Sequence, residues 1–425
     1  MEIIINGNAA SGKVDAPSSK SQTHRAFICS LMCDGTSNIR RPLICDDTMA
    51  TIEACKQFGA EIEITGKHAA VSSHSSLEAP SGAIDCGESA STLRMMMAPS
   101  ALFRGNTTFT GKEGLLRRPI KELVNAMEGL GVRSIYKGRE GFPPVEVIGG
   151  GIKGGKISIR GDISSQYISS LLLALPGALR ESTIEVRERF ESMPYVQMTL
   201  DVMEEFGITV EAAGDLRHLR VPNDQGYRPS KVGIEGDFSS AAFLMAAGCL
   251  GGEVSVGNLD HGSKQGDKAI VGILQAMGAN MEIGDDHVVV SKSELRAIDL
   301  NCSQIPDLVP IIAVLCSQAR GISILRNLGR LKIKESDRVS AISTELIKMG
   351  ADIEVSDDTM RIRGKRPLEG TALHSHNDHR IAMSLIVASL SATGYSTMSG
   401  TKCISKSYPS FLDDMNRLGV DIDVL

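Results

Sequence analysis

Apolar residues gather in six helix-length runs, whose starts recur along the chain at intervals of 68 to 75 residues. Each run begins among small polar or charged residues and ends near a glycine. The starts lie near Ser21, Ser89, Ser164, Asp237, Asp307 and Asp378, and the glycines are Gly35, Gly105, Gly177, Gly251, Gly321 and Gly394. A helix that is apolar on all sides is normally buried, so the pattern predicts six buried helices.

A second motif has nearly the same period and predicts one amphipathic helix in each unit. It is a glycine between two apolar residues, at Gly59, Gly131, Gly207, Gly278, Gly350 and Gly419. Glycine ends helices readily because it enters the left-handed conformation without a Cβ clash. Apolar residues alternate after five of the six glycines, which indicates a following strand. Two motifs with a common period predict a sixfold internal repeat.

The length of 425 residues suits two or three domains, and six units could form two groups of three. The polar residues 223–230 mark the expected divide between the third and fourth units. Residues 2–5 are strand-like rather than typical of a targeting peptide. These features predict a two-domain α/β protein.

Composition narrows the class of protein. The net charge of −6 argues against nucleic-acid binding, which usually requires a basic face. The longest apolar run, residues 167–179, contains serines and Pro176 and is too short to cross a membrane. Nine cysteines without a CxxC pair indicate reduced thiols rather than disulfides or a zinc site. We therefore expect a cytoplasmic protein that binds neither nucleic acid nor membrane.

Residues 17–25 place cations at the start of the first predicted buried helix. Ser19 or Ser21 could cap this helix, and Lys20 and Arg25 would lie in its first turns. Positive side chains are unfavourable there, because the free N–H groups of a helix start attract anions. The segment suggests a bound phosphate or carboxylate. A capped helix with two solvent-exposed cations is the alternative.

Other predicted buried helices also begin among unusual polar groups. These groups are Glu88, Ser89 and Arg94; Ser164, Ser165 and Gln166; Asp307; and Asn377, Asp378, His379 and Arg380. Further charges lie between helices, at Arg117, Arg118, Lys334, Glu335, Arg338 and residues 402–406. A single charge cluster is usually a solvated face, but equivalent places in a repeat would be brought together. Such a pocket would bind anions through Arg and Lys, with Asp307 and Glu335 as candidate base and acid.

A metal site is the competing interpretation of residues 374–379, which contain three histidines. Their spacing matches no helical or zincin pattern, and Arg380 would repel a cation. We expect no metal.

These motifs resemble those of the 5-enolpyruvylshikimate-3-phosphate synthase family over essentially the full length. The matching stretches are Ser19-Lys20-Ser21 with Arg25, Leu116-Arg117-Arg118-Pro119-Ile120, Ser164-Ser165-Gln166, residues 192–195, Ile305-Pro306-Asp307, Lys334-Glu335-Ser336-Asp337-Arg338, Asn377-Asp378-His379-Arg380, and Lys406 with Pro409. The resemblance implies a two-domain inside-out α/β barrel of six βαβαββ repeats, three per domain, closing over a cleft. It also implies that residues 1–15 belong with 228–425, and that 16–227 form the other domain.

The resemblance implies transfer of the enolpyruvyl group of phosphoenolpyruvate to the 5-hydroxyl of 3-phosphoshikimate, with release of phosphate. This reaction belongs to the shikimate pathway, which leads to chorismate and aromatic amino acids. It needs charge stabilisation and positioning but neither a metal nor an organic cofactor. We expect a monomer whose partners are its two small substrates.

The family positions imply a role for each candidate residue. The implied catalytic residues are Asp307 near the 5-hydroxyl, Glu335 near the methylene carbon of phosphoenolpyruvate, and Lys20. The implied 3-phosphoshikimate ligands are Lys20, Ser21, Arg25, Ser164, Ser165, Gln166, Ser192, Asp307 and Lys334. The implied phosphoenolpyruvate ligands are Lys20, Ala90, Arg118, Gln166, Arg338, Arg380 and Lys406.

Three positions depart from the family pattern. Glu88 replaces a usual Asn, Ala90 a common Gly, and Arg330 an Asn found in some members. Members with Gly at the Ala90 position are inhibited by glyphosate, which occupies the phosphoenolpyruvate position. The extra methyl group predicts tolerance through overpacking, to which the charge of Glu88 would add.

Two other functions compete with this interpretation. The related enolpyruvyl transferase that acts on UDP-N-acetylglucosamine typically carries a reactive Cys on a loop after the second helix, but residues 115–118 contain none. A non-catalytic anion-binding repeat protein would not need Asp307 and Glu335 among its cations, because each carboxylate weakens anion binding.

Overall fold

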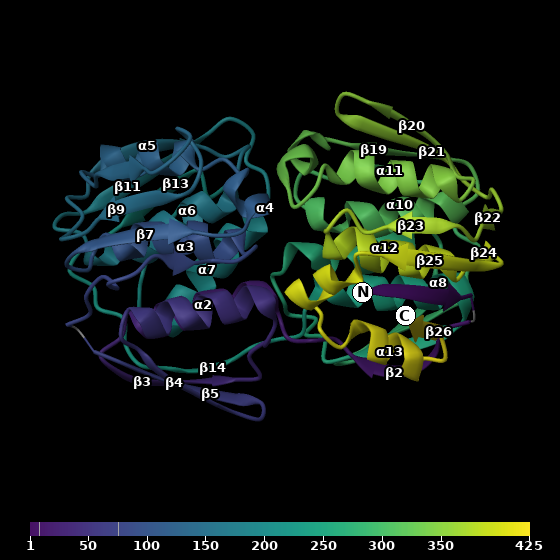
Figure 1. Cartoon of the computed structure of the whole chain (residues 1–425), viewed down its shortest axis with the longest axis horizontal. Coiled ribbons are helices and arrows are strands. Elements are labelled where there is room, and N and C mark those ends of the chain that lie inside the picture. The colour runs from purple at the N-terminus through teal and green to yellow at the C-terminus, as the bar shows by residue number, and fades with distance from the viewer. Residues whose placement is uncertain (8, 75) are drawn as a thin grey trace. The chain divides into compact units, whose positions relative to one another are not determined.

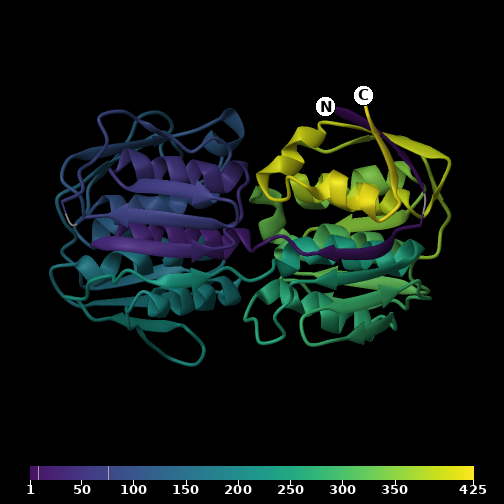
Figure 2. The same ribbon diagram turned by 90° about the horizontal axis from the view of Figure 1, so that it is seen from below.

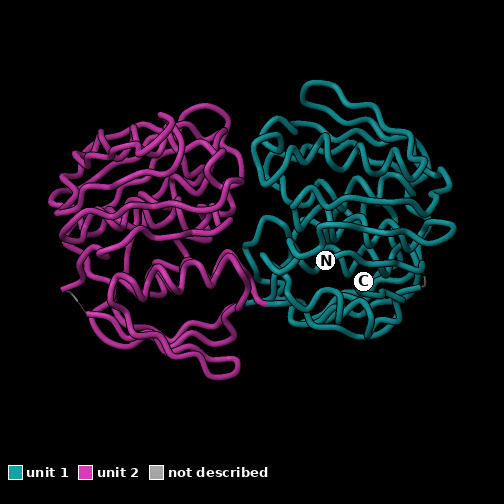
Figure 3. The backbone as a smooth tube through the Cα atoms, viewed as in Figure 1, with its two compact units in different colours: residues 1–17, 235–425 teal, residues 18–234 magenta. Residues whose placement is uncertain are grey.

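The computed structural model describes residues 1–7, 9–74 and 76–425, which divide into two compact units (Figure 3). Unit 1 comprises Met1–Pro17 and Glu235–Leu425, and unit 2 comprises Ser18–Ile234. Each unit has its own cluster of buried hydrophobic side chains.

The six predicted buried helices are confirmed (Figure 1). They are α1 (Lys20–Leu31), α3 (Ala90–Ser100), α6 (Ser165–Ala174), α8 (Phe238–Gly251), α10 (Val309–Gln318) and α12 (His379–Ser389). The amphipathic helices are α2 (Asp46–Gln57), α5 (Lys121–Gly129), α7 (Met193–Glu205), α9 (Ala269–Ala276), α11 (Arg338–Lys348) and α13 (Phe411–Arg417). A short helix, α4 (Glu113–Leu116), precedes α5 in the chain.

Three four-stranded sheets surround the buried helices of each unit. In unit 2 the strand orders are β14 (Lys231–Gly233), β3 (Gly35–Arg40), β5 (His68–Ser73), β4 (Glu61–Thr65); β6 (Ile84–Asp85), β7 (Asn106–Thr110), β9 (Val145–Ile148), β8 (Ser134–Tyr136); and β10 (Lys156–Arg160), β11 (Ser182–Arg187), β13 (His218–Val221), β12 (Glu211–Ala212). In unit 1 they are β16 (Asn280–Ile283), β17 (Val288–Ser291), β15 (Glu253–Gly257), β2 (Ser11–Asp15); β18 (Asp299–Asn301), β19 (Ile322–Arg326), β21 (Thr359–Arg363), β20 (Asp352–Ser356); and β23 (Ala372–His374), β25 (Tyr395–Ser399), β1 (Glu2–Asn6), β26 (Asp421–Val424). Strands β22 (Leu368–Glu369) and β24 (Ala392–Thr393) form a separate pair.

Each four-stranded sheet contains one parallel pair, and its other neighbours are antiparallel. Parallel strands need a crossover connection, and in four of the sheets the buried helix α3, α6, α10 or α12 supplies it. In the other two sheets, the two strands of the parallel pair come from distant parts of the chain. Strand β14 pairs with β3, and β2 pairs with β15. The chain therefore passes from one unit to the other ahead of both α1 and α8.

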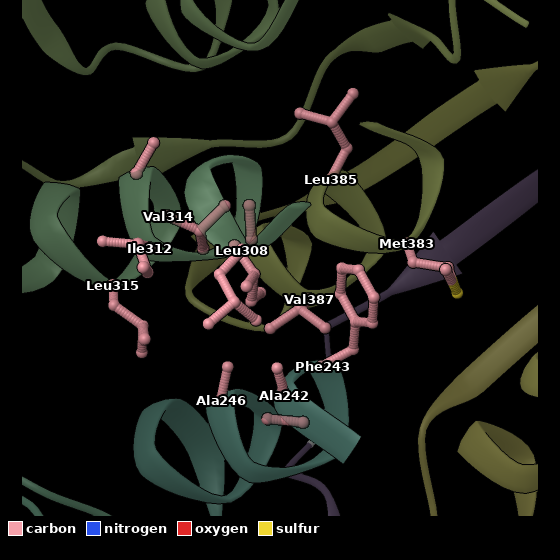
Figure 4. Close-up of a cluster of buried hydrophobic side chains, with 14 of the residues drawn as sticks. Ala242, Phe243, Ala246, Leu308, Ile312, Val314, Leu315, Met383, Leu385 and Val387 are labelled. Atoms are coloured by element: carbon pink, nitrogen blue, oxygen red, sulfur yellow. The ribbon is translucent and has the colours of Figure 1, made fainter. Parts of the chain in front are cut away.

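The core of unit 1 shows why the buried helices are apolar on all sides. Side chains of α8, α10 and α12 meet there, among them Phe243, Ile312 and Val387 (Figure 4). Full burial of a side chain of this size contributes about 1.5–3 kcal/mol. Strands cover these helices on their outer sides, as the turned view shows (Figure 2). At the starts of two of these helices, Asp237 and Asp378 cap the first turns of α8 and α12.

No helix in the described ranges is both long and apolar enough to cross a membrane.

Candidate functional site

Arg338 is the centre of a charged cluster in unit 1. It is the first residue of α11, and its side chain is 1% exposed. Its Nε donates to Asp378 Oδ2 at 2.7 Å, Nη1 to Asp307 Oδ1 at 2.7 Å, and Nη2 to Glu335 Oε2 at 2.5 Å. Burial lowers the pKa of Arg338, but the three carboxylates outweigh it and hold the pKa well above its usual value. One buried guanidinium thus joins both candidate catalytic carboxylates.

Asp307 lies in a 3-10 turn, Pro306–Leu308, directly ahead of α10. Besides Arg338, its carboxylate contacts Lys334 Nζ at 3.2 Å and Arg380 Nη2 at 3.4 Å. Burial raises the pKa of Asp307, yet these three cations bring it well below the usual range. Asp307 is therefore ionised and, with the cations beside it, a weak base. An anionic ligand that draws the cations away would raise its basicity.

Lys334 is the cation of this cluster that loses its proton most readily. It follows the 3-10 helix Gly329–Ile333, which carries Arg330. Burial lowers the pKa of Lys334 to about 8; Asp307 opposes this shift, and Arg330 and Arg338 add to it. The unusual Arg330 thus weakens the hold of Lys334 on its proton.

The remaining cations of unit 1 that the sequence singled out, Arg380 and Lys406, lie around the start of α12. Asp378 caps this helix by accepting from Arg380 N at 2.9 Å. Lys406 Nζ donates to the carbonyl oxygen of Asn377 at 2.9 Å. Direct contacts therefore connect Asp307, Lys334, Glu335, Arg338 and Arg380, and Lys406 joins this set through the turn that precedes α12.

Arg25 is the most buried cation that the sequence predicted in unit 2, at 2% exposed. It donates to Thr199 Oγ1 at 2.7 Å, Ser169 Oγ at 3.2 Å, Tyr195 O at 2.9 Å and Ser21 O at 2.8 Å. All four acceptors are neutral. Burial lowers the pKa of Arg25 to about 10, so it stays charged at neutral pH. This side chain ties α1 to α6 and α7.

Lys20 is the first residue of α1, and its Nζ lies 2.6 Å from Asp47 Oδ2 on α2. Ser19 caps the helix by accepting from Gln22 N at 3.4 Å, and no acidic residue lies in the first turn. The side chain of Lys20 is only 14% exposed. Since Arg25 is also buried, the alternative of two solvent-exposed cations is wrong.

A buried chain of hydroxyl groups links α1, α2 and α3. His24 Nδ1 lies 2.7 Å from Thr51 Oγ1, which lies 2.7 Å from Thr92 Oγ1. Thr92 in turn is 2.8 Å from Ser89 Oγ, the cap of α3. Burial, with smaller effects from Lys20 and Arg25, lowers the pKa of His24 well below its usual value. The imidazole is therefore neutral and adds no charge to the helix starts.

Gln166 has a fixed amide orientation near the start of α6. Its Oε1 accepts from Arg94 Nη1 at 3.0 Å, and its Nε2 donates to Ser91 Oγ at 2.8 Å. Arg94 also lies over the Tyr167 ring, 5.3 Å from the centroid. The side chains of α3 thus hold Gln166 in place.

Three predicted serines lie at the starts of α6 and α7. Ser164 caps α6 by accepting from Gln166 N at 3.3 Å, and Ser165 is the first helical residue. Ser192 occupies the N-cap position of α7 with a left-handed φ of 56°. All three serines are buried, and the positive end of a helix dipole favours anions beside such hydroxyls. This arrangement suits a phosphate group.

Burial distinguishes two adjacent arginines in the loop before α5. Arg118 is 6% exposed, whereas the Arg117 side chain is 74% exposed and pairs with Glu113. The sequence motif contains both, and burial singles out Arg118 as the functional candidate. Nearby, Glu88 lies against Gly114 of α4, where an added Cβ would be 2.6 Å from Glu88 Oε2.

Several partners in these clusters were not predicted from the sequence. Asp47, Thr199 and Ser169 lie within helices, away from any recognised motif. Asp378, by contrast, was among the polar groups that the sequence placed at the start of a buried helix. Among the described residues, no three His, Cys, Asp or Glu side chains are grouped so as to hold a metal ion.

Comparison with known proteins gives one consistent family. The family model described as EPSP synthase (3-phosphoshikimate 1-carboxyvinyltransferase) matches residues 4–415. The chain is 38% identical to a 3-phosphoshikimate 1-carboxyvinyltransferase of Methanococcus maripaludis, with 97% of each chain covered. It is 37% identical to a protein of the same name from Methanocaldococcus jannaschii, with 99% of each covered.

Solved structures agree with the sequence relatives. An EPSP synthase from Acinetobacter baumannii is 25% identical, with a TM-score of 0.84 and complete coverage of both chains. The enolpyruvyl transferase NikO from Streptomyces tendae is 19% identical, with a TM-score of 0.80 over 99% of this chain and 98% of its own. This second likeness concerns the fold alone. The predicted inside-out α/β barrel of the enolpyruvyl transferases is confirmed.

Proposed function

Because this chain belongs to the EPSP synthase family, we propose that it transfers the enolpyruvyl group of phosphoenolpyruvate to the 5-hydroxyl of 3-phosphoshikimate and releases phosphate. The observation that carries this proposal is the placement of Asp307 and Glu335 on the buried guanidinium of Arg338. A protein that only binds anions gains nothing from carboxylates among its cations. An enzyme that transfers protons to and from anionic substrates needs both the carboxylates and the cations.

In the proposal, unit 2 supplies most of the groups that hold 3-phosphoshikimate. The phosphate accepts hydrogen bonds from the hydroxyls of Ser164, Ser165 and Ser192 at the starts of α6 and α7, with Gln166 beside them. Lys20, Ser21 and Arg25 bind the hydroxyl and carboxylate of the ring. Four N–H bonds of Arg25 already have protein partners, so one remains for a ligand.

Unit 1 in the proposal supplies the proton-transfer groups, together with Lys334 as a further ligand of the 3-phosphate. Asp307 accepts the proton of the 5-hydroxyl, and Glu335 donates a proton to the methylene carbon of phosphoenolpyruvate. Attack of the 5-hydroxyl oxygen on C2 then gives a tetrahedral intermediate that carries a methyl group. The C2–O bond to phosphate breaks while a methyl proton returns to Glu335, which restores the vinyl group, and the proton taken from the 5-hydroxyl leaves with phosphate.

The cations that the proposal assigns to phosphoenolpyruvate are Lys20, Arg118, Arg338, Arg380 and Lys406. It also assigns Gln166 and Ala90 to this substrate. The phosphate and carboxylate of this substrate would compete with Asp307 for Arg380. Binding of phosphoenolpyruvate therefore raises the basicity of Asp307 at the moment that a base is needed.

The test is release of phosphate by the purified chain supplied with 3-phosphoshikimate and phosphoenolpyruvate. We expect phosphate release only with both substrates, together with an enolpyruvyl product on the 5-hydroxyl. UDP-N-acetylglucosamine in place of 3-phosphoshikimate should give none. Turnover with that acceptor instead, or binding of both anions without turnover, would contradict the proposal.

We also propose that the enzyme is a cytoplasmic monomer. The nine cysteines are free thiols, which suits a reducing compartment. Light scattering at working concentration should give a mass near 45.3 kDa. A mass twice as large would contradict the monomer.

A further inference from the structure

The turn that leads into α12 contains two consecutive residues in an unfavourable backbone conformation. His376 has φ of 52° and Asn377 has φ of 55°, in the left-handed region, which Asn and His tolerate better than most non-glycine residues but seldom occupy twice in succession. Conformations of this kind persist only where surrounding contacts enforce them. The turn therefore depends on groups outside itself.

Glu345, on α11, makes such contacts with a side chain that is 1% exposed. Its Oε2 accepts from the backbone N of His374 at 3.1 Å, and its Oε1 lies 2.8 Å from His376 Nε2. An ionised carboxylate can only accept, so His376 carries a proton on Nε2. Burial raises the pKa of Glu345, but hydrogen bonds from Lys348, His376 and His374 bring it below its usual value. The anion is thus stabilised where it holds the turn.

The same turn carries groups of the candidate site. The carbonyl oxygen of Asn377 accepts from Lys406 Nζ at 2.9 Å. The next residue, Asp378, caps α12 by accepting a hydrogen bond from Arg380 N. It also accepts a hydrogen bond from Arg338 Nε at 2.7 Å. Helix α11 therefore contacts this segment from both ends, through Arg338 in its first turn and Glu345 near its last. Displacement of the turn would move the Asn377 carbonyl that accepts from Lys406. It would also move Asp378, which accepts from the backbone N of Arg380.

We infer that Glu345, acting through His376, is a positioning residue that holds Lys406 and Arg380 in place for phosphoenolpyruvate. The inference rests on the proposed function, which assigns these two cations to that substrate. Glu345 does not touch substrate; it fixes the backbone from which the binding groups extend. Its loss should therefore weaken one substrate more than the other.

The principal test is Glu345→Gln in the full-length enzyme. Glutamine keeps the volume but loses the charge and presents an N–H₂ group where only acceptors fit. We expect KM for phosphoenolpyruvate to rise about ten-fold, a moderate effect for a shifted positioning group. KM for 3-phosphoshikimate should change less than about two-fold, since the proposed function assigns Lys406 and Arg380 to phosphoenolpyruvate alone.

Two further variants separate positioning from general stability. Lys348→Met removes a charged partner of Glu345 whose own side chain is 44% exposed. It leaves the contacts of Glu345 with the turn, so KM for phosphoenolpyruvate should stay unchanged. His376→Asn removes the imidazole with a residue that tolerates positive φ. It should reproduce the effect of Glu345→Gln, and the double variant should add little, because both act through one bond. The His376 side chain is 33% exposed, so this variant carries the test if Glu345→Gln does not fold.

An unchanged KM for phosphoenolpyruvate in His376→Asn, or equal rises for both substrates, would overturn the inference. Absence of turnover in the unmutated enzyme would instead contradict the proposed function. In that case, hydrogen exchange at residues 374–378 still decides the role of Glu345. Exchange should be faster in Glu345→Gln than in Lys348→Met, and equal rates would overturn the inference.

Discussion

Unit 1 and unit 2 both bury cations near the starts of helices, but they balance the charge differently. Arg338 of unit 1 is bound by three carboxylates, whereas Arg25 of unit 2 donates only to neutral oxygens. The pKa shifts follow this difference: carboxylates hold the pKa of Arg338 well above its usual value, and burial lowers that of Arg25 to about 10. Two similar repeats therefore provide two different electrostatic environments.

The difference suggests that the two units have different roles, one in substrate binding and the other in proton transfer. Hydroxyls, and a cation such as Arg25 that donates only to neutral oxygens, favour an incoming anion, because no carboxylate competes with it. Lys20, which pairs with Asp47, is an exception in unit 2. Carboxylates held among cations weaken anion binding but can accept or donate protons when a ligand changes their surroundings. We therefore expect unit 2 to account for most of the binding of 3-phosphoshikimate and unit 1 for the proton transfers.

The largest expected effect tests the charge balance directly. Arg338→Met leaves Asp378 buried without its cation, and breaking a buried pair in this way costs about 3–5 kcal/mol of unfolding free energy. Arg25→Met should cost less, about 1–3 kcal/mol. Ser169 and Thr199 are 2.7 Å apart, so they can still pair, and Thr199 also donates to Tyr195 O. Urea unfolding of both variants beside the unmutated chain measures the difference.

Hydrogen exchange would show which unit opens in each variant. Equal losses for Arg338→Met and Arg25→Met would mean that the two environments are energetically alike. The comparison between the units would then have no energetic basis.

A smaller effect concerns shape recognition in unit 2. Ala90 is the first residue of the buried helix α3 and is 6% exposed, so the backbone there cannot easily move away from a ligand. Overpacking by its methyl group costs about 1–3 kcal/mol, or about 5- to 150-fold in affinity for glyphosate. Ala90→Gly should lower the inhibition constant of glyphosate by that factor and change KM for phosphoenolpyruvate less.

Glu88→Asn beside Ala90→Gly separates charge from shape. The added effect of the Glu88 change should weaken with salt, because it acts through charge. An unchanged glyphosate constant in Ala90→Gly would show that the methyl group does not discriminate.

The smallest expected effect is a pH dependence from unit 1. As pH rises through about 8, Lys334 loses its proton, so kcat/KM for 3-phosphoshikimate should fall by up to about ten-fold per pH unit. The effect on stability has the opposite sign. The folded chain releases this proton at lower pH than the unfolded chain, so the contribution of Lys334 to stability rises between about 8 and 10.5.

Lys334→Arg is the matched control, since arginine stays charged across this range. Its kcat/KM should lack the fall above pH 8. A fall that persists in Lys334→Arg would assign the titration to another group.

Helix periodicity predicted the fold from the sequence more fully than the site. The runs that start near Ser21, Ser89 and Asp378 became buried helices because each has no polar face to expose. The pairing of strands β2 and β14 with partners far away in the sequence was harder to predict. Short strands such as Lys231–Gly233 carry too little pattern to identify a partner. Pairing of β14 with β3 depends on residues almost 200 positions apart.

Candidate site residues could be singled out in the sequence where they belong to a helix start or a dense charged motif, as with Lys20, Gln166 and Arg338. Their supports were not. Thr199 and Glu345 lie within amphipathic helices, where one polar residue is normally solvated and nothing local marks it as buried. Burial of Glu345 results from packing of α11 against the turn before α12. Such a result of tertiary structure leaves no local pattern in the sequence.

The most direct test of the division of labour is Asp307→Asn, studied by calorimetric binding of 3-phosphoshikimate and by phosphate release. Asparagine keeps the shape of the side chain but cannot accept the proton of the 5-hydroxyl. We predict that affinity for 3-phosphoshikimate is retained or increased, because a carboxylate leaves the cations, while phosphate release falls at least about 100-fold. Near-normal phosphate release, or a loss of affinity that parallels the loss of turnover, would contradict the assignment of binding to unit 2 and proton transfer to unit 1.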